Sequence, residues 1–380
     1  MNQVADPGVA AGRLGGYRFR HLRALDGFRG IAALLVACYH TKTIPHFTGA
    51  GQAGIEMFLV LSGFLITSIL RREQMETGAI RLRRFYARRL RRLFPALLAY
   101  SLVAIGVAEV TGWWDRNPIF LNAAASLTYT SNWAQLQFSS IPILFGHTWS
   151  LAVEEQYYLT WPLLLLGLAL LPDRRRWPAG VALLVAALMW RGLTIADDPT
   201  LRRIRNGTDI RALGLLAGGL LALTLEHGRH RVEGFLRAPA TGLLAAGALV
   251  LSWFVVDEYT GRMFMTWMVV AIAASTVLLG HCALTDVLGG PSPVGRVLSR
   301  RSLVWLGAVS YSLYLWHPLA ITAIRQTDVA LGVRPVRMGL MLGVALVLAV
   351  TSYHTVERRF RAPERPVPLP EPRPVPIGGP

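Results

Sequence analysis

Stretches of about 20 mostly apolar residues recur along most of this chain, and they constrain its fold more than any other feature. A hydrocarbon layer about 30 Å thick requires about 20 apolar residues of α-helix to cross it. The 380 residues are 53% hydrophobic with a mean hydropathy of +0.41, which is too apolar for an ordinary soluble domain. The sequence therefore predicts an all-α, polytopic membrane helix bundle.

We predict ten transmembrane helices from these stretches. Their approximate ranges are 25–42, 52–70, 93–110, 148–171, 177–196, 210–226, 239–256, 263–282, 303–325 and 337–356. The chain then divides into an N-terminal cytoplasmic segment (1–21), a membrane domain (22–361) and a proline-rich, disordered cytoplasmic tail (362–380). We expect no second folded domain. The N-terminal segment lacks the apolar core of a cleavable signal, so the first helix should direct insertion.

The net charge of +17 is not an argument for a nucleic-acid partner, although basic surfaces are typical of phosphate binding. The arginines lie in the short gaps between apolar stretches. Assigning alternate gaps to opposite sides places 27 Lys and Arg on the N-terminal side, 9 on the other and three inside spans. Because positive charge accumulates on the cytoplasmic side, we predict cytoplasmic termini, a cell-membrane location and the lipid bilayer as a partner.

Several common site types are missing from the sequence. The two cysteines, Cys38 and Cys282, lie in separate apolar stretches and form no CxxC pair. The chain has no GKS/T phosphate loop, HExxH zinc motif, GxSxG nucleophile elbow or dinucleotide fingerprint. We therefore expect no metal site and no permanently bound cofactor.

The first predicted span, LDGFRGIAALLVACYH, contains an arginine and a histidine. Arg29 and His40 are eleven positions apart, almost three helical turns, so they share one face about 16 Å apart along the axis. Asp26 lies one turn below Arg29. A charged side chain within a bilayer costs about 2.5–3.5 kcal/mol and normally faces a cavity or a partner. Arg29 and His40 are thus predicted to mark two ends of a polar slot.

A second cluster, FYARRLRRLFPA, approaches the third span from the cytoplasmic side. Its arginines include Arg88, Arg89 and Arg92, and a guanidinium group can bind phosphate in a bidentate fork. The alternative is an anchor for lipid headgroups, a common role of such clusters. We favour Arg89 and Arg92 for phosphate binding because they lie one turn apart.

The fourth predicted span begins with HTWSLAVEEQYYLTWP. On a helix, His147, Ser150, Glu154 and Tyr158 share one face and could line a cavity. A belt of interfacial aromatic residues would explain the tryptophans and tyrosines, but it would not explain Glu154.

Three weaker candidates remain. His317 precedes Pro318 in YSLYLWHPL, where the missing N–H of proline leaves a carbonyl free; a structural role competes with substrate binding. Asp209 and Arg211 begin the sixth span, either to position substrate or as an ion pair in the bundle.

Taken in order, these motifs resemble the acyltransferase 3 family of integral membrane acyltransferases, from about Leu22 to Arg361. The matching segments are LRALDGFRGIAALLVACYH, GIEMFLVLSGFLI, FYARRLRRLFPA, WSLAVEEQYYL, TDIRALGLLAGGLLA, YSLYLWHPL and VERRF. The resemblance implies transfer of an acyl group, commonly acetyl from acetyl-CoA as co-substrate, to a hydroxyl of a carbohydrate or glycosylated molecule. Glu56 departs from the family pattern, in which valine or a similar residue is frequent.

The same resemblance assigns roles to individual residues. Arg29 and His40 fall on the family's R-x10-H pair, Arg89 and Arg92 on its RxxR, and Glu154 on the carboxylate of its WSLxxE block. Our hypothesis is that His40 is the general base or carries the acyl group transiently; the sequence leaves both open. Glu154 would orient the imidazole of His40.

The remaining candidates surround this centre. The acyl-CoA donor would bind along Arg29 and the arginine cluster, and the acceptor would meet Asp26, His147, Ser150, Tyr158, Asp209, Arg211 and His317. A cell-envelope carbohydrate or lipid-linked sugar is the first choice of acceptor, and a natural product such as a macrolide or glycoside the second. A membrane transporter is the alternative from another class, but we find no internal repeat of the kind transporters often carry.

Overall fold

The computed structural model describes most of the chain between residues 12 and 360. The described ranges are 12–14, 17–19, 22–44, 47–112, 116–137, 143–197, 202–227, 230–255, 261–288, 290–326 and 334–360. The predicted tail, 362–380, and most of the predicted N-terminal segment lie outside the described residues.

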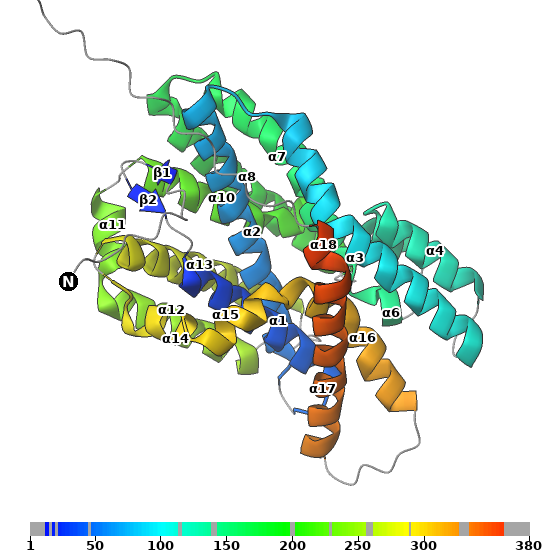
Figure 1. The fold of residues 1–380 in the computed structure, drawn as a ribbon. Coiled ribbons are helices and arrows are strands. Elements are labelled where there is room, and N and C mark those ends of the chain that lie inside the picture. Colours follow the sequence, from blue (N-terminus) through cyan, green and yellow to red (C-terminus); the bar gives the residue numbers. More distant parts are fainter. Residues whose placement is uncertain are drawn as a thin grey trace, which may run out of the picture.

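Helices make up nearly all of the described chain, as the sequence predicts (Figure 1). The first half contains α1 (Arg23–Thr41), α2 (Thr48–Thr77), α3 (Leu82–Thr111), α4 (Arg116–Leu127), α5 (Ser131–Gln137), α6 (Ile143–Gly146), α7 (Trp149–Ala169) and α8 (Asp173–Asp197). The second half contains α9 (Arg202–Asn206), α10 (Thr208–Glu226), α11 (His230–Arg237), α12 (Pro239–Val255), α13 (Gly261–Leu288), α14 (Pro293–Leu298), α15 (Arg301–Ala308), α16 (Ser310–Gln326), α17 (Arg334–Ser352), the π-helix η1 (Tyr353–Glu357) and α18 (Arg358–Phe360). The strands β1 (Gly12–Leu14) and β2 (Tyr17–Phe19) form an antiparallel pair.

The centre of the bundle is formed by α2 and α10, which lie side by side (Figure 1). In each, 72% of the most apolar window is buried, whereas the share falls to 17% in α8 and 22% in α17. A helix that is apolar all round and buried belongs to the core. Exposed apolar residues such as Leu193 on α8 and Val347 on α17 give the outer helices a surface suited to lipid.

Glycines allow α2 and α10 to approach until their backbones touch. A Cβ atom on Gly63 would lie 1.9 Å from the carbonyl oxygen of Leu215, and one on Gly218 would lie 1.9 Å from that of Val60. Small residues at such crossings are typical of helix contacts in membranes. Gly63 therefore has the packing role that its position in mid-helix suggests.

The predicted number of ten spans goes beyond what helix length and apolarity support. Among the described residues, six helices are long and apolar enough to cross a membrane, and α11 and α12, bent by 70°, would make a seventh. Every predicted range does coincide with a helix. However, α1 and α7 carry polar residues that lower their hydropathy, and the predicted span 303–325 is broken at Val309 into α15 and α16.

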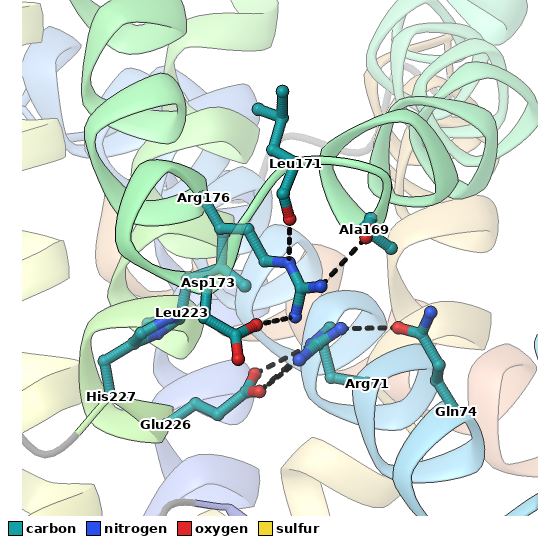
Figure 2. Close-up of polar contacts among 9 residues, drawn as sticks. All are labelled: Arg71, Gln74, Ala169, Leu171, Asp173, Arg176, Leu223, Glu226 and His227. Carbon is teal, nitrogen blue, oxygen red and sulfur yellow. Dashed lines mark hydrogen bonds and ion pairs between the residues drawn. The ribbon is translucent and has the colours of Figure 1, made fainter. Parts of the chain in front are cut away.

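A polar network ties together the ends of α2, α8 and α10 (Figure 2). Arg71 of α2 donates to Glu226 of α10 and to Gln74, where the distance is 2.5 Å. Arg176 of α8 pairs with Asp173 and donates to two carbonyls at the end of α7. These contacts fix the relative positions of the central helices at the end opposite the cavity described below.

We expect Gly63→Ala to destabilise the fold, because the new methyl group would separate α2 from α10. Overpacking of this kind typically costs about 1–3 kcal/mol. The measurement is the apparent melting temperature of the purified protein in detergent. Gly106→Ala on α3 is the control, since a Cβ there meets nothing within 4 Å; equal melting temperatures for the two variants would contradict the prediction.

Candidate functional site

A cavity of about 190 Å³ opens where α1, α2, α7 and α16 come together. His40 lines it from α1, Gln52 from α2 and Tyr314 from α16, while His147 and Trp149 line it from the start of α7. Segments more than 250 residues apart in the sequence thus share one wall. The cavity combines aromatic side chains with a few polar groups, as small-molecule sites usually do.

His40 lies on the last turn of α1. The helix ends at Lys42, whose backbone has a left-handed conformation (φ 53°) and whose N–H donates to the carbonyl of Tyr39. The Nδ1 atom of His40 lies 2.8 Å from the carbonyl oxygen of Val36. A neutral imidazole has one donor and one acceptor nitrogen. Assigning the proton to Nδ1 satisfies this carbonyl and leaves Nε2 as the basic nitrogen.

His317 of α16 contacts His40 directly. Its Nε2 lies 3.3 Å from Nδ1 of His40, and the two ring centroids are 4.8 Å apart. The other nitrogen, Nδ1, lies 3.2 Å from the carbonyl oxygen of Leu313. If that nitrogen donates to Leu313, Nε2 of His317 is an acceptor, and the single N–H of His40 is shared between the Val36 carbonyl and this nitrogen. Both contacts then favour the same tautomer of His40.

Arg325 holds the backbone that carries His40. Its guanidinium, from the last turn of α16, donates to the carbonyl oxygens of His40 and Thr41, both at 2.9 Å. These carbonyls end α1 and have no partner within the helix. A cation at a helix C-terminus also interacts favourably with the helix dipole. The helix α16 therefore contacts the ring of His40 through His317 and its backbone through Arg325.

His147 is buried in the turn before α7. Its backbone carbonyl accepts a hydrogen bond from the hydroxyl of Tyr314, which is itself 2.8 Å from the hydroxyl of Ser150. The imidazole ring packs edge-on against Tyr100 and lies 5.4 Å from the ring of His317, centroid to centroid. Burial lowers the pKa of His147 to about 3, so this side chain is neutral at physiological pH.

A second, charged cluster lies on the same face of α7, farther along the helix. Glu154 accepts a hydrogen bond of 3.1 Å from Tyr158, and Arg89 stacks 3.8 Å above the Tyr158 ring. Arg89 also lies 3.8 Å from Glu155. The electrostatic neighbours of Arg29 include Glu154 and Arg89. The structure thus brings Arg29, Arg89, Glu154 and Tyr158 together, as parts of one cluster.

Glu154 lies between this cluster and the cavity. Arg29 and Arg89 are its electrostatic neighbours on one side, and it is also an electrostatic neighbour of Tyr314, which lines the cavity. The cavity lining from α1 comprises Val36, Tyr39 and His40, about two to three turns beyond Arg29. His40, at one predicted end of the slot, lines the cavity, and Arg29, at the other end, belongs to the charged cluster. Glu154 is an electrostatic neighbour of both groups.

Other predicted residues lie farther from the histidines. Arg88 is exposed and 3.8 Å from Glu73, Arg92 is half-buried on the same helix, and Asp26 is an electrostatic neighbour of Arg29 on α1. Asp209 accepts hydrogen bonds of 2.8 Å from Arg203 and Trp190. Among the described residues, no ion pair joins Asp209 to Arg211.

Arg211 forms an ion pair with Glu56 in the bundle interior, and both side chains are fully buried. Its other nitrogens donate to Gln52 at 2.9 Å and to the carbonyl of Arg205 at 2.7 Å. The structure therefore pairs Arg211 with Glu56 rather than with Asp209. It also explains Glu56, the residue at which the sequence departs from the family pattern: its carboxylate balances a buried guanidinium.

Sequence reasoning missed two residues of the site. Tyr314 lies three positions before His317, a spacing that puts both on one face of a helix, so the sequence held a usable signal. Arg325 carried no such signal, because its role depends on the end of α1, 284 residues away in the chain.

A family model described as an acyltransferase domain, that of the acyltransferase 3 family, matches residues 22–354. No solved structure matches the chain.

Three curated relatives illustrate the similarity. A Bacillus subtilis protein provisionally named peptidoglycan O-acetyltransferase YrhL is 34% identical over 365 residues, covering 90% of this chain and 55% of that protein. A Staphylococcus aureus protein provisionally named an O-acetyltransferase is 31% identical over 364 residues (90% and 58%). Peptidoglycan O-acetyltransferase OatA of Listeria monocytogenes is 29% identical over 373 residues (91% and 56%). The chain spans a little over half the length of these relatives.

Replacing Arg325 with leucine is expected to loosen the last turn of α1, because two charge-assisted hydrogen bonds to its carbonyls are lost. A loss of about 1.4 kcal/mol in local stability would speed amide exchange about tenfold. Hydrogen exchange of a peptide covering residues 36–42 measures this. Arg334→Leu, at an exposed position of α17, is the control, and unchanged exchange in Arg325→Leu would contradict the role of Arg325.

Proposed function

The chain belongs to the acyltransferase 3 family, and on this premise we propose that it is a membrane O-acyltransferase. It transfers an acyl group, acetyl from acetyl-CoA, to a hydroxyl group of a cell-envelope carbohydrate. The names of the curated relatives support an acetyl group and an acceptor in peptidoglycan. The six apolar helices support a location in the cell membrane.

The observation that carries this proposal is a histidine on a cavity wall, with its tautomer fixed by a second histidine. Acyl transfer to an alcohol requires a base that removes the hydroxyl proton. His40 lines the cavity and its Nδ1 faces Val36 and His317. Its Nε2 is therefore the nitrogen that can accept a proton, and the reference pKa of histidine near 6.5 suits a base at neutral pH.

The reaction follows from this assignment. Nε2 of His40 takes the proton of the acceptor hydroxyl while the hydroxyl oxygen attacks the thioester carbonyl, so that a C–O bond forms and an oxyanion develops. When the oxyanion collapses, the C–S bond breaks, and the CoA thiolate leaves with the proton from His40. The products are an acyl ester and CoA. This direct transfer makes His40 a general base, and no acyl-histidine is required.

We place the donor on the side of the charged cluster. The exposed guanidinium of Arg88 and the half-buried one of Arg92, both on α3, suit the phosphates of CoA. The pantetheine arm would run past Arg29 and Glu154 towards the cavity. The carboxylate of Glu154 balances the charge of Arg29 and Arg89 along this path, so in this scheme Glu154 is a positioning residue.

The excess of Lys and Arg on one side of the ten predicted spans supports a cytoplasmic location of both termini and of this arginine cluster. That orientation agrees with the cytoplasmic supply of acyl-CoA that the scheme needs. The acceptor would then reach His40 from the outer face through the cavity.

The direct test uses the purified chain in lipid nanodiscs with radiolabelled acetyl-CoA and soluble peptidoglycan fragments. We expect label in the fragments that mild alkali releases, because esters are labile to alkali and amides are not. Label in small-molecule glycosides instead would identify a different acceptor. The absence of label in every hydroxylated acceptor, with no release of CoA, would overturn the proposed function.

His40→Ala should reduce transfer at least 100-fold, since general base catalysis typically contributes about 10²–10⁴-fold. The rate of ester formation measures it. His227→Ala is a matched control: His227 has the same bond to the carbonyl four residues earlier (2.7 Å to Leu223) but lies beside Glu226 (Figure 2) and does not line the cavity. Near-normal turnover in His40→Ala would remove His40 from the mechanism.

Arg29→Ala should impair use of the donor, because a cationic partner of the donor path is lost. Hydrogen bonds to charged groups are worth about 1.5–3 kcal/mol, so kcat/KM for acetyl-CoA should fall about 10- to 150-fold. Arg23→Ala, at an exposed position of the same helix, should leave it unchanged. An unaltered kcat/KM in Arg29→Ala would contradict the predicted slot.

A further inference from the structure

The cavity contains a buried polar side chain that the scheme above does not use. His147 is 5% exposed and lines the cavity wall. Both of its ring nitrogens are buried, and neither makes a hydrogen bond to a described side chain. The polar group that acts on the ring is the backbone carbonyl of Leu144, which already accepts a hydrogen bond from the hydroxyl of Tyr100. A buried polar group without a partner costs about 1–3 kcal/mol. Such a cost in a cavity wall suggests that the partner is a bound substrate.

The surroundings of His147 hold its position without using its nitrogens. Tyr314 fixes the backbone through a hydrogen bond to the His147 carbonyl, and Ser150 fixes the Tyr314 hydroxyl. Tyr100 packs edge-on against the imidazole with ring centroids 5.6 Å apart. These contacts hold the imidazole ring, and with it the N–H group, in one position. Fixed donors stabilise a developing charge without having to reorganise during the reaction.

Other polar side chains in the same lining already have partners. The Tyr314 hydroxyl donates to the His147 carbonyl, and the Gln135 amide donates to the carbonyl of Gly146 at 3.0 Å. The oxygen of Gln52 accepts from Arg211. By contrast, both ring nitrogens of His147 are buried in this wall without a hydrogen bond to a described side chain.

We propose that His147 is a further catalytic residue, whose N–H donates a hydrogen bond to the thioester carbonyl oxygen as it becomes an oxyanion. This inference rests on the proposed function. His40 removes the hydroxyl proton on one side of the reacting carbon, and His147 stabilises the negative oxygen on the other. Both rings lie around His317, 4.8 Å and 5.4 Å from its centroid, so one acyl carbon can be within reach of both.

The neutral state of His147 fits this role. Burial keeps the pKa of the imidazole low, so the ring keeps a single N–H and remains a poor base. A neutral imidazole can act as a hydrogen-bond donor to a developing oxyanion. The division of labour between a basic His40 and a neutral, donating His147 follows from their different environments.

The test compares His147→Phe with His147→Gln in the labelled acetyl-CoA assay with peptidoglycan fragments. Phenylalanine keeps the packing against Tyr100 but has no N–H, whereas glutamine supplies an amide N–H. Loss of one oxyanion donor typically lowers kcat about 10²–10³-fold. We expect that loss in His147→Phe, a KM for acetyl-CoA within about threefold of wild type, and recovery in His147→Gln to within about tenfold of the wild-type kcat.

Rates are expressed per folded protein, from the melting temperature and elution profile of each variant. His281→Gln is the control for loss of a buried histidine, since His281 is buried on α13 and bonds the carbonyl of Leu236 at 2.6 Å, away from the cavity lining. The shape of the pH–rate profile should be the same in wild type and His147→Gln, because the substitution leaves His40 in place. A purely structural role would not give rescue by glutamine.

The outcomes separate the two proposals. If wild type transfers label and His147→Phe keeps a kcat within about threefold of wild type, or if His147→Gln is as inactive as His147→Phe, the role of His147 is overturned and the proposed function stands. If wild type itself transfers no label and releases no CoA, the proposed function fails first.

Discussion

The backbone contact between α2 and α10 is the constraint on which the rest of the bundle depends. Lipid chains are as apolar as leucine, so helices in a membrane associate through close packing rather than through hydrophobic burial. Gly63 and Gly218 allow that packing because neither has a side chain, so a backbone carbonyl of the opposite helix occupies the space that a Cβ atom would need. α1 and α7 then pack on α2, and α16 packs on α1 (Figure 1). This order of contacts brings His40 and His147 to one cavity, with His317 in contact with His40.

Buried charge is the second constraint, and the bundle meets it in two different ways. Glu56 and Arg211 neutralise one another in the interior, and Gln52 completes the hydrogen bonds of the guanidinium. A buried charge without such a partner would cost several kcal/mol. The group around Glu154 is looser, because Arg89 lies 3.8 Å from Glu155 and stacks on Tyr158. The first arrangement is suited to holding helices together, and the second to rearranging around a substrate.

The sequence predicted the all-helical class and the candidate site residues, but not all of the partners that those residues have in the structure. His40 was predicted from its spacing to Arg29, because eleven residues return to the same helix face. The partner predicted for it was Glu154, whereas the contact that the structure gives is with His317. Glu154 instead accepts from Tyr158. Distances between helices far apart in the sequence depend on packing, which periodicity does not encode.

The sequence by itself determined the apolar helices, the arginine-rich side of the bundle and the motifs of an acyltransferase, because each is a local pattern of composition or spacing. Only the tertiary structure decided which polar residues meet. It paired Glu56 with Arg211, joined α16 to the end of α1 through Arg325, and set His147 in a cavity wall. Each of these contacts joins residues more than 100 positions apart or depends on a wall built from several helices. Only the way the helices pack against one another could therefore determine them.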